Sequence, residues 1–305
     1  MIEYIIRNKK GKLQKLDKYV KDCWINVVDP NEDELNFLIT KFKLKKEDIK
    51  DGLDIHESPR FEIVKKRVYI FLTVPTEQII YEDMSSFLVI YSQNDLITIS
   101  KHPLEIFQQI FERYKKTVFF NSSRNLLRIL FSISKNFDAS VHKIIKDVKH
   151  NKTDLSKLNN KDIARLINHE NKLNNYISSF GETMQTYKKV LKAEFIQFHD
   201  EDEEKLEDLI NDLNETYTLC KSTLKAISNM RDYYSTKLST DLNKTVTLLT
   251  GFTIFLAIPT LFASIYGMNV TLPFQNSQNL LAVMGVIVLV AWASMVFILK
   301  YLKSI

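Results

Sequence analysis

The sequence predicts an α/β domain, followed by an all-α part with a long stalk helix and two carboxyl-terminal transmembrane helices. Three observations predict this fold class. Segments rich in β-branched and aromatic residues alternate with a helical segment over the first hundred or so residues. No proline occurs between Pro103 and Pro259, as expected for long helices. Two long apolar runs lie near the end of the chain.

Composition excludes several classes of protein. The 305 residues carry a formal net charge of +5, which is small and dispersed, so we expect no nucleic-acid partner. Cys23 and Cys220 are isolated and form no CxxC motif, which argues against a disulfide or zinc site and is compatible with a reducing compartment. The first twelve residues are too short and too charged for a signal peptide. There is no P-loop, nucleotide fingerprint or Ser-His-Asp pattern, so we expect neither a nucleotide nor enzymatic activity.

The α/β domain is predicted over residues 1–102. Its β-rich segments are 23–29, 60–74 and 85–100. Between the first two, NEDELNFLITKFKL has helical spacing, with Asn31 as the N-cap and Glu34 three residues later.

A helical segment is predicted over 103–202, followed by a stalk helix over 203–244. The periodicity indicates helices at about 121–150, 159–198 and from 203 onward. The breaks fall at 151–154 and at the acidic run HDEDEE (199–204), which we interpret as a solvated turn. In the stalk, steps of three and four connect Ile210, Leu213, Tyr217, Cys220, Leu224, Ile227, Tyr234 and Leu238.

Nothing interrupts the stalk before the first apolar run, so one helix of about 90 Å is expected from 203 to 266. A lone helix of that length has nothing to hold it. We therefore predict that several copies bundle into an oligomer.

The transmembrane helices are predicted at 245–266 and 280–299, each about one bilayer in length. Lys and Arg flank them at Arg231, Lys237, Lys244, Lys300 and Lys303, the last two in a basic tail at 300–305, whereas the loop at 267–279 has none. The positive-inside rule places both termini in the cytosol and the loop outside.

One face of the first span is small and partly polar. It consists of Asn243, Val246, Leu249, Thr253, Ala257, Thr260 and Ser264. Such a face either packs against a neighbouring helix or lines a water-filled pore, and the pattern alone does not choose between these.

The first span ends at Tyr266-Gly267-Met268-Asn269. Taken alone, Gly and Asn at a helix end are typical of a left-handed C-cap. In this position, before a second span, the Gly-Met-Asn sequence resembles the signature of the CorA family of divalent-cation channels. LDIHESPRFEI (53–63) also looks like a segment of that family, and the proline-free stalk fits it. The resemblance covers most of the chain.

The resemblance implies a funnel-shaped homopentamer in the cell membrane, with a pore lined by five copies of the face defined above. Tyr266, Gly267, Met268 and Asn269 would form the selectivity filter. Mg²⁺ prefers oxygen ligands and loses water reluctantly, so neutral amide and carbonyl oxygens suit the hydrated ion. Met268 is expected to pack and shape the turn, because a thioether is a poor Mg²⁺ ligand. Asn243 and Thr260 would form polar rings, and Val246 and Leu249 apolar constrictions that gate by excluding water.

Two departures from the family pattern stand out. The loop VTLPFQNSQN lacks the acidic residue that many relatives carry after the signature, and Pro259 lies one position nearer the signature. Transport of Zn²⁺, Co²⁺ or Ni²⁺ remains an alternative, as does a membrane-anchored scaffold without transport.

The resemblance also implies regulatory ions held between subunits, with Asp208 on the stalk and Asp51 in the α/β domain as ligands. Bound Mg²⁺ would then close the pore by population shift. The alternative is that both are solvated surface acids. His56 and Glu57 do not indicate a metallohydrolase, because the second histidine of HExxH is missing and Pro59 interrupts a helix there.

Overall fold

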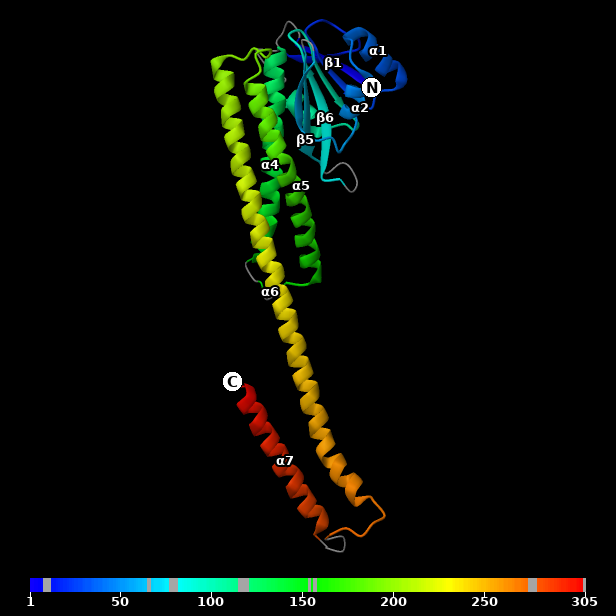
Figure 1. Cartoon of the computed structure of the whole chain (residues 1–305), viewed down its shortest axis with the longest axis vertical. Helices are drawn as coiled ribbons and strands as arrows, with labels where there is room; N and C mark the ends of the chain where they lie inside the picture. The colour runs from blue at the N-terminus through cyan, green and yellow to red at the C-terminus, as the bar shows by residue number, and fades with distance from the viewer. Residues whose placement is uncertain are drawn as a thin grey trace. The chain divides into compact units, whose positions relative to one another are not determined.

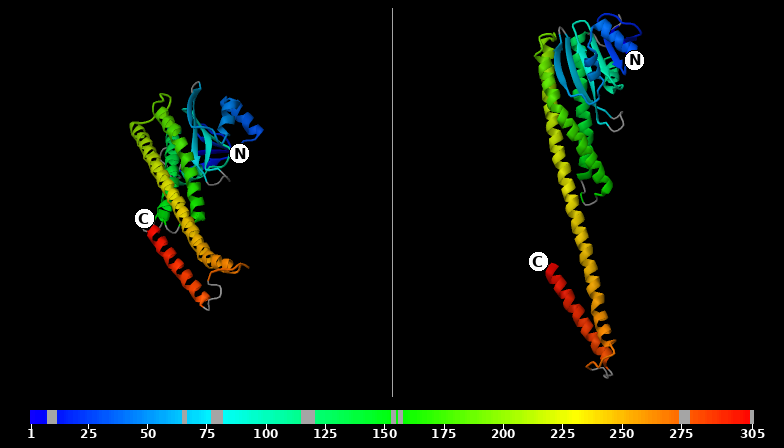
Figure 2. Two further views of the ribbon diagram at one scale, coloured as in Figure 1. Left: turned by 60° about the horizontal axis from the view of Figure 1, so that its bottom comes forward. Right: turned by 45° about the vertical axis from the view of Figure 1, so that its right-hand side comes forward.

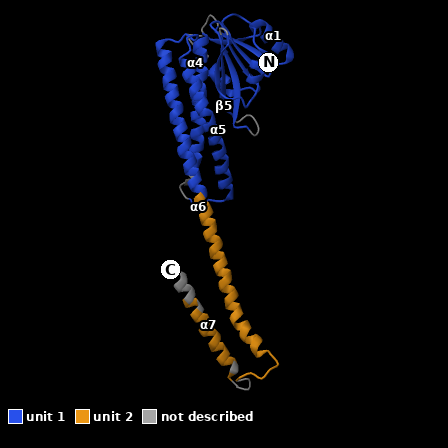
Figure 3. Cartoon of the chain, in the orientation of Figure 1, with its two compact units in different colours: residues 1–231 blue, residues 232–305 orange. Residues whose placement is uncertain are grey.

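The computed structural model describes residues 1–7, 12–64, 67–76, 82–114, 121–152, 155, 158–273 and 279–303 (Figure 1). The chain divides into two compact units, Met1–Arg231 and Asp232–Ile305 (Figure 3). Helix α6 (Asp200–Tyr266) contributes to both units, and α7 (Leu280–Lys303) lies in the second.

Unit 1 contains a mixed sheet of seven described strands in the order β2-β1-β3-β7-β6-β5-β4. The strands are β1 (Ile2–Arg7), β2 (Leu13–Leu16), β3 (Trp24–Val28), β4 (Arg60–Val64), β5 (Arg67–Pro75), β6 (Met84–Tyr91) and β7 (Leu96–Ser100). β3 and β7 run parallel, and the other described pairs are antiparallel. The three predicted β-rich segments are confirmed; the second and third each supply two neighbouring antiparallel strands, and β1 and β2 were not predicted.

Helices cover both faces of the sheet. On one face, α1 (Glu32–Phe42) and α2 (Lys46–Gly52) bury Leu38, Phe42 and Ile49 against the strands. The other face packs against α3 (Glu105–Arg113), α4 (Ser122–Lys152) and α5 (Asn160–Leu191). Gly52 is required where α2 meets β6, because an added Cβ would lie 2.6 Å from Leu88 Cβ.

The predicted start of α1 is confirmed in detail. The Asn31 side chain accepts a hydrogen bond from the Glu34 N–H at 2.8 Å, and the Glu34 carboxylate accepts one from the Asn31 N–H at 2.9 Å. This reciprocal capping box satisfies two backbone donors that the first turn of a helix leaves free.

Two predicted helix limits were wrong. Helix α5 ends at Leu191 rather than near 198, although Ala193 and Ile196 beyond its end remain buried in the core. The acidic run 199–204 is not a solvated turn, because α6 begins at Asp200 and the run forms its first turn. Carboxylates are favourable there, since they face the positive end of the helix dipole. Within the run, Asp202 is buried.

The continuity of α6 from the stalk to Tyr266 is confirmed. Within unit 1, α4, α5 and the first part of α6 run side by side (Figures 1 and 2). The buried face of α6 comprises Leu206, Leu209, Leu213, Thr216, Cys220, Thr223, Ile227 and Met230. It shares Leu213, Cys220 and Ile227 with the predicted face, whereas Ile210, Tyr217 and Leu224 are only partly buried at its edge.

We predicted an oligomer because a lone long helix has nothing to hold it, and this reason was partly wrong. Up to Met230, α6 packs against the hydrophobic core of its own chain and needs no second copy to hold it. From 231 onward the described residues of α6 are exposed or partly exposed, including the predicted face members Tyr234 and Leu238. In this second part, none of the described residues of α6 is buried.

In unit 2, the end of α6 and helix α7 are both strongly apolar. α6 is the one described helix that is long and apolar enough to cross a membrane, and its most apolar stretch is not buried within the chain. The described apolar stretch of α7, Leu281–Ser294, is shorter than a helix needs to cross a membrane. A second membrane span thus remains a prediction.

Candidate functional site

The candidate site begins where α6 ends. Gly267 N–H donates to the Ala263 carbonyl at 2.9 Å, and Met268 N–H donates to the Ile265 carbonyl at 3.3 Å. These bonds satisfy carbonyls that a helix end leaves free. The φ angle of Gly267 is outside the left-handed region, and among the described non-glycine residues only Asp22, Asp29 and Lys43 have positive φ. The left-handed C-cap considered for this sequence is therefore not formed.

Gly267 instead lies close to the end of the helix. A Cβ at this position would lie 3.1 Å from the Ala263 carbonyl oxygen, which is tighter than most real Cβ contacts. A larger residue would need a shift of a few tenths of an ångström between the turn and the helix end. The glycine thus allows the chain to leave α6 abruptly, with the backbone of the turn uncovered.

The signature residues after the helix are exposed. Gly267, Met268 and Asn269 are all exposed, with 57% of Met268 accessible. The packing expected of Met268 is not observed in the single chain and stays a prediction for the assembled protein. The Tyr266 hydroxyl donates a hydrogen bond to the Pro273 carbonyl at 3.3 Å and so connects the helix end to the turn. The amide of Asn269 is left at the tip of an uncharged turn.

The predicted pore-lining residues are all exposed along α6. They are Asn243, Val246, Leu249, Thr253, Ala257, Thr260 and Ser264. Thr253 donates its hydroxyl hydrogen to the Leu249 carbonyl at 2.9 Å, and Thr260 donates to the Leu256 carbonyl at 2.8 Å. Since each hydroxyl hydrogen is used inside the helix, the oxygen presents only acceptor lone pairs outward.

The same bonding occurs off the predicted face, so it does not by itself distinguish a pore. Thr247 and Thr250 donate to the Asn243 and Val246 carbonyls, both at 2.8 Å. What the bonding decides is the chemistry of the face. Its hydroxyls accept hydrogen bonds, as a hydrated cation requires, because the water molecules around a cation point their hydrogens outward.

The two predicted regulatory acids lie in unit 1, in different surroundings. Asp51 is on α2, and its Oδ2 accepts a hydrogen bond from Arg60 Nη2 at 2.7 Å. Asp208 is exposed on α6 and lines a cavity of about 620 Å³. Among the described residues, no group of three or more His, Cys, Asp or Glu side chains is arranged to hold a metal ion. Each acid therefore offers a single carboxylate within its own chain.

The cavity beside Asp208 contains an ion-pair network. Asp202 is almost fully buried and lies 3.5 Å from Arg124 Nε and 3.7 Å from Lys205 Nζ. Arg128 is packed 4.8 Å from the centre of the Tyr114 ring. Burial and the neighbouring Arg124 lower the pKa of Arg128 from its ordinary value, against the opposing effects of Tyr114 and Asp202. Basic groups thus neutralise the buried acid of this cavity, and Asp208 lies at its exposed side.

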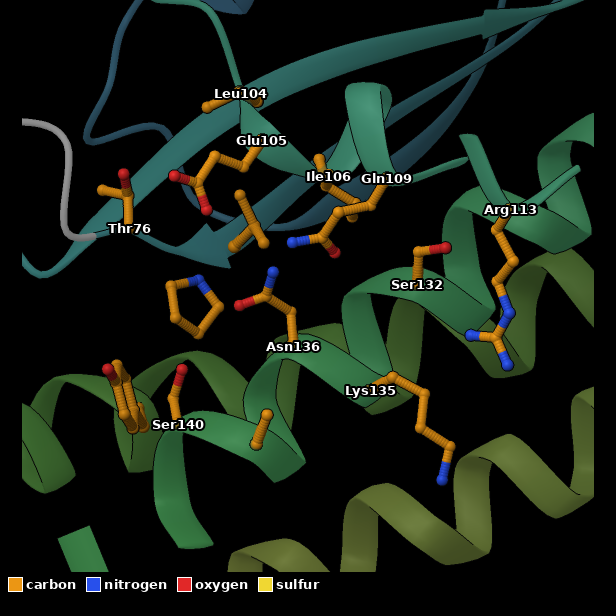
Figure 4. A pocket seen from close by; sticks show the side chains of 14 residues that line it. Thr76, Leu104, Glu105, Ile106, Gln109, Arg113, Ser132, Lys135, Asn136 and Ser140 are labelled. Atoms are coloured by element: carbon orange, nitrogen blue, oxygen red, sulfur yellow. The ribbon is translucent and has the colours of Figure 1, made fainter. Parts of the chain in front are cut away.

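Unit 1 also contains a smaller polar pocket between β5, α3 and α4, with a volume of about 270 Å³. The ends of Glu105, Gln109 and Asn136 point toward one another in it, whereas Arg113 and Lys135 lie to one side (Figure 4). Its described lining includes neither histidine nor cysteine.

One contact between α6 and α7 in unit 2 was not predicted from the sequence. The indole of Trp292 on α7 stacks on Phe255 of α6, with ring centroids 3.9 Å apart and planes inclined by 14°. Its Nε1–H also donates to the Phe255 carbonyl at 3.0 Å. The only signal in the sequence was a tryptophan inside an apolar run, and such a residue does not indicate its partner.

Fold and site together describe a chain in which an α/β domain precedes a long helix that is apolar enough to cross a membrane and ends in an uncharged Gly-Met-Asn turn. A family model described as "CorA-like Mg2+ transporter protein" matches residues 21–300. The chain belongs to this family.

Individual relatives agree with this assignment. The chain is 24% identical over 299 residues to the cobalt/magnesium transport protein CorA of Methanocaldococcus jannaschii, covering 92% of this chain and 90% of that protein. The complete structure of the CorA magnesium transporter from the same organism superimposes with a TM-score of 0.83 at 20% identity, covering 98% and 97% of the two chains. The ZntB cytoplasmic domain from Vibrio parahaemolyticus gives a TM-score of 0.65 at 11% identity, covering 78% of this chain and 98% of that one.

Proposed function

We propose that this chain is one subunit of a homopentameric channel that carries hydrated Mg²⁺ across the cell membrane. The observation that carries the proposal is the exposed, uncharged Gly267-Met268-Asn269 turn at the end of an exposed apolar helix, in a chain of the CorA family. Both termini face the cytosol in this proposal, and the turn lies on the outer side.

Ion selection in this proposal depends on neutral oxygens. Five Asn269 amide oxygens and five Gly267 carbonyls surround the axis and accept hydrogen bonds from the water shell of the ion. Mg²⁺ keeps its water, so the cost of dehydration is avoided and the ion is released easily. The acceptor hydroxyls of Thr253 and Thr260 continue this lining along the pore.

The energy for uptake comes from the ion gradient and the membrane potential. A potential of 100 mV contributes about 2.3 kcal/mol per charge, or about 4.6 kcal/mol for a divalent ion. Inward movement of Mg²⁺ against a modest concentration difference therefore needs no ATP.

Co²⁺ is the second candidate ion, because the printed name of the M. jannaschii relative includes cobalt. A hydrated Co²⁺ ion meets the same neutral acceptors, so the two ions compete for one filter. Uptake of Mg²⁺ measured against added Co²⁺, Zn²⁺ or Ni²⁺ ranks the four ions directly.

Regulation by internal Mg²⁺ is a further part of the proposal. Ions held between Asp51 of one subunit and Asp208 of the next stabilise a closed state, and their loss opens the pore. The support for this is the exposure of Asp208 and the partial exposure of Asp51 in the single chain.

The proposal is tested by Mg²⁺ uptake into proteoliposomes containing Asn269→Ala. Loss of the amide oxygen should reduce uptake at least tenfold, about the effect of 1.4 kcal/mol or more on ion binding at the filter. Val270→Ala is the matched control, since Val270 is exposed beside Asn269 but offers no polar side-chain atom. If the wild-type protein takes up no Mg²⁺, the scaffold alternative is favoured. Equal uptake by wild type and Asn269→Ala would remove Asn269 from the filter.

A further inference from the structure

Helix α6 contains a proline, Pro259, inside its apolar part. Proline has no N–H, so the carbonyl four residues earlier, that of Phe255, loses the donor that a regular helix would supply. The proline ring also crowds that carbonyl. In hydrocarbon no water can replace the missing donor, so the carbonyl needs a partner from elsewhere in the protein.

Trp292 supplies that partner. Its indole N–H donates to the Phe255 carbonyl at 3.0 Å, and its ring stacks flat on the Phe255 side chain. The indole therefore makes a polar and an apolar contact with the same residue. Among side chains suited to an apolar span, tryptophan combines a large ring with a hydrogen-bond donor that is not also an acceptor.

We propose that Trp292 is a positioning residue for the pore helix and fixes the course of α6 at Pro259. The inference rests on the proposed function in one respect, namely that α6 lines the pore. Pro259 lies between Ala257 and Thr260 of the predicted pore face, so the course of the helix at this point sets the direction in which Thr260, Ser264 and the Gly-Met-Asn turn point. α7 then supports α6 at Pro259, where the proline removes one backbone hydrogen bond of the helix.

A tryptophan that only anchors the protein in the bilayer would behave differently. Such a residue needs its amphipathic ring at the membrane interface and has no reason to select one carbonyl. The selected carbonyl here is the one that the proline deprives of a donor. This correspondence distinguishes a specific clamp from general lipid contact.

The test compares Trp292→Phe in two backgrounds. Phenylalanine keeps the stacking and removes the N–H, so Mg²⁺ uptake into proteoliposomes should fall about three- to tenfold, the equivalent of one interhelical hydrogen bond. Pro259→Ala restores the N–H of residue 259, which then serves the Phe255 carbonyl. Adding Trp292→Phe to Pro259→Ala should therefore change uptake less than twofold. An equal fall in both backgrounds, or none in the wild-type background, would overturn the inference.

A spectroscopic measurement tests the contact independently of transport. The chain has two tryptophans, so protein labelled with 5-fluorotryptophan should give two fluorine NMR resonances, and Trp292→Phe identifies the one from Trp292. Pro259→Ala should shift the Trp292 resonance and leave that of Trp24 in place, because the Trp24 indole donates to Thr98 in unit 1. A Trp292 resonance that does not move contradicts the clamp, even if the protein transports no ion.

Phe297→Leu is the matched control for both measurements. Phe297 is an aromatic residue of the same helix with 73% of its surface accessible. Its replacement removes a ring from α7 without touching the Phe255 carbonyl, so uptake and the Trp292 resonance should stay as in the wild type. A loss of uptake as large as that of Trp292→Phe would mean that any aromatic residue of α7 matters, and would overturn the specific role.

Discussion

At the scale of single residues, Arg60 forms more interactions than its sequence context indicates. Its Nη2 and Nε donate to Asp51 and Glu62, each at 2.7 Å, and Nη1 donates to Glu57. The guanidinium also lies 3.6 Å from the centre of the Phe71 ring. We predict that Arg60→Ala lowers the free energy of unfolding by about 1–3 kcal/mol, because three carboxylates lose their common counter-charge. Thermal unfolding of the full-length protein in detergent measures this.

Arg60→Lys should recover only part of that loss, since an ammonium group lacks the planar fork that reaches several carboxylates at once. The control is Lys101→Ala, which breaks the exposed pair between Lys101 Nζ and Asp29 Oδ1 at 2.6 Å. An exposed pair of this kind contributes about 1 kcal/mol or less. Equal shifts in melting temperature for the two alanine variants would contradict a special role for Arg60.

Local features of single residues were predictable from the sequence, whereas their distant partners were not. The Asn31 capping box is confirmed because both members lie within one turn. The bond from Arg60 to Asp51 joins α2 to β4, and the bond from Trp292 to Phe255 joins residues 37 apart. Residue types and spacing carry no information on such pairs until the fold brings them together.

At the scale of secondary-structure elements, the first part of α6 has a buried thiol whose ionisation opposes folding. Burial raises the pKa of Cys220 from 9.0 to about 12. Below pH 9 the thiol is protonated in both states. Between pH 9 and about 12 the unfolded chain releases the proton and the native protein keeps it, so the native state binds more protons and stability falls as pH rises.

We therefore predict that Cys220→Ala changes the pH dependence of unfolding. Near pH 8 the variant should be less stable by about 1 kcal/mol, because a small cavity replaces the sulfur. Above pH 9 this difference should shrink by up to about 1.4 kcal/mol per pH unit, since alanine does not ionise. Urea unfolding at several pH values measures both effects.

Burial and the neighbouring Asp95 raise the pKa of Tyr19 to about 12. Tyr19 is present in both proteins, so it contributes equally to both curves of stability against pH and cancels from their difference. Parallel curves from pH 8 to 11 would contradict the assignment to Cys220.

Element boundaries show why periodicity was sufficient in some places and not in others. The start of α1 had a capping residue, and the run from the stalk to Tyr266 had no proline before 259 and only a tolerable glycine. The end of α5 had no such signal. Ala193 and Ile196 continue an apolar pattern because they pack on the core, although the backbone has already left the helix. Because these two residues are buried beyond the end of α5, the predicted helix was too long.

At the scale of the whole molecule, the family and the α/β domain with its long helix follow from the sequence, but the reason for assembly did not. The long helix was expected to need other copies to hold it, whereas up to Met230 it packs on α4 and α5 of the same chain. A periodic apolar face predicts that a helix is covered and does not identify the cover. The face after residue 231, with its polar residues among apolar ones, is the part for which we propose assembly.

The proposed regulation by internal Mg²⁺ concerns the proposed assembly, because Asp51 and Asp208 each offer one carboxylate per chain. A Mg²⁺ ion at Asp51 must compete with Arg60, whose guanidinium already holds that carboxylate. Ion binding is then expected to be weak enough to follow the internal Mg²⁺ concentration, which is what a sensor requires.

We predict that the double variant Asp51→Asn with Asp208→Asn raises the internal Mg²⁺ concentration needed for half-inhibition of uptake by about fivefold or more, within the usual range of coupling between sites. Asp212→Asn is the matched control, since Asp212 lies one turn from Asp208 on α6 and lines the same cavity. It removes one acidic charge from the surface beside Asp208 and leaves both proposed ligands in place, so it should leave half-inhibition unchanged. An equal shift in the control would assign the effect to the general charge of this surface. Unchanged inhibition in the double variant would remove both acids from regulation, while the role of Asn269 in the filter would stand.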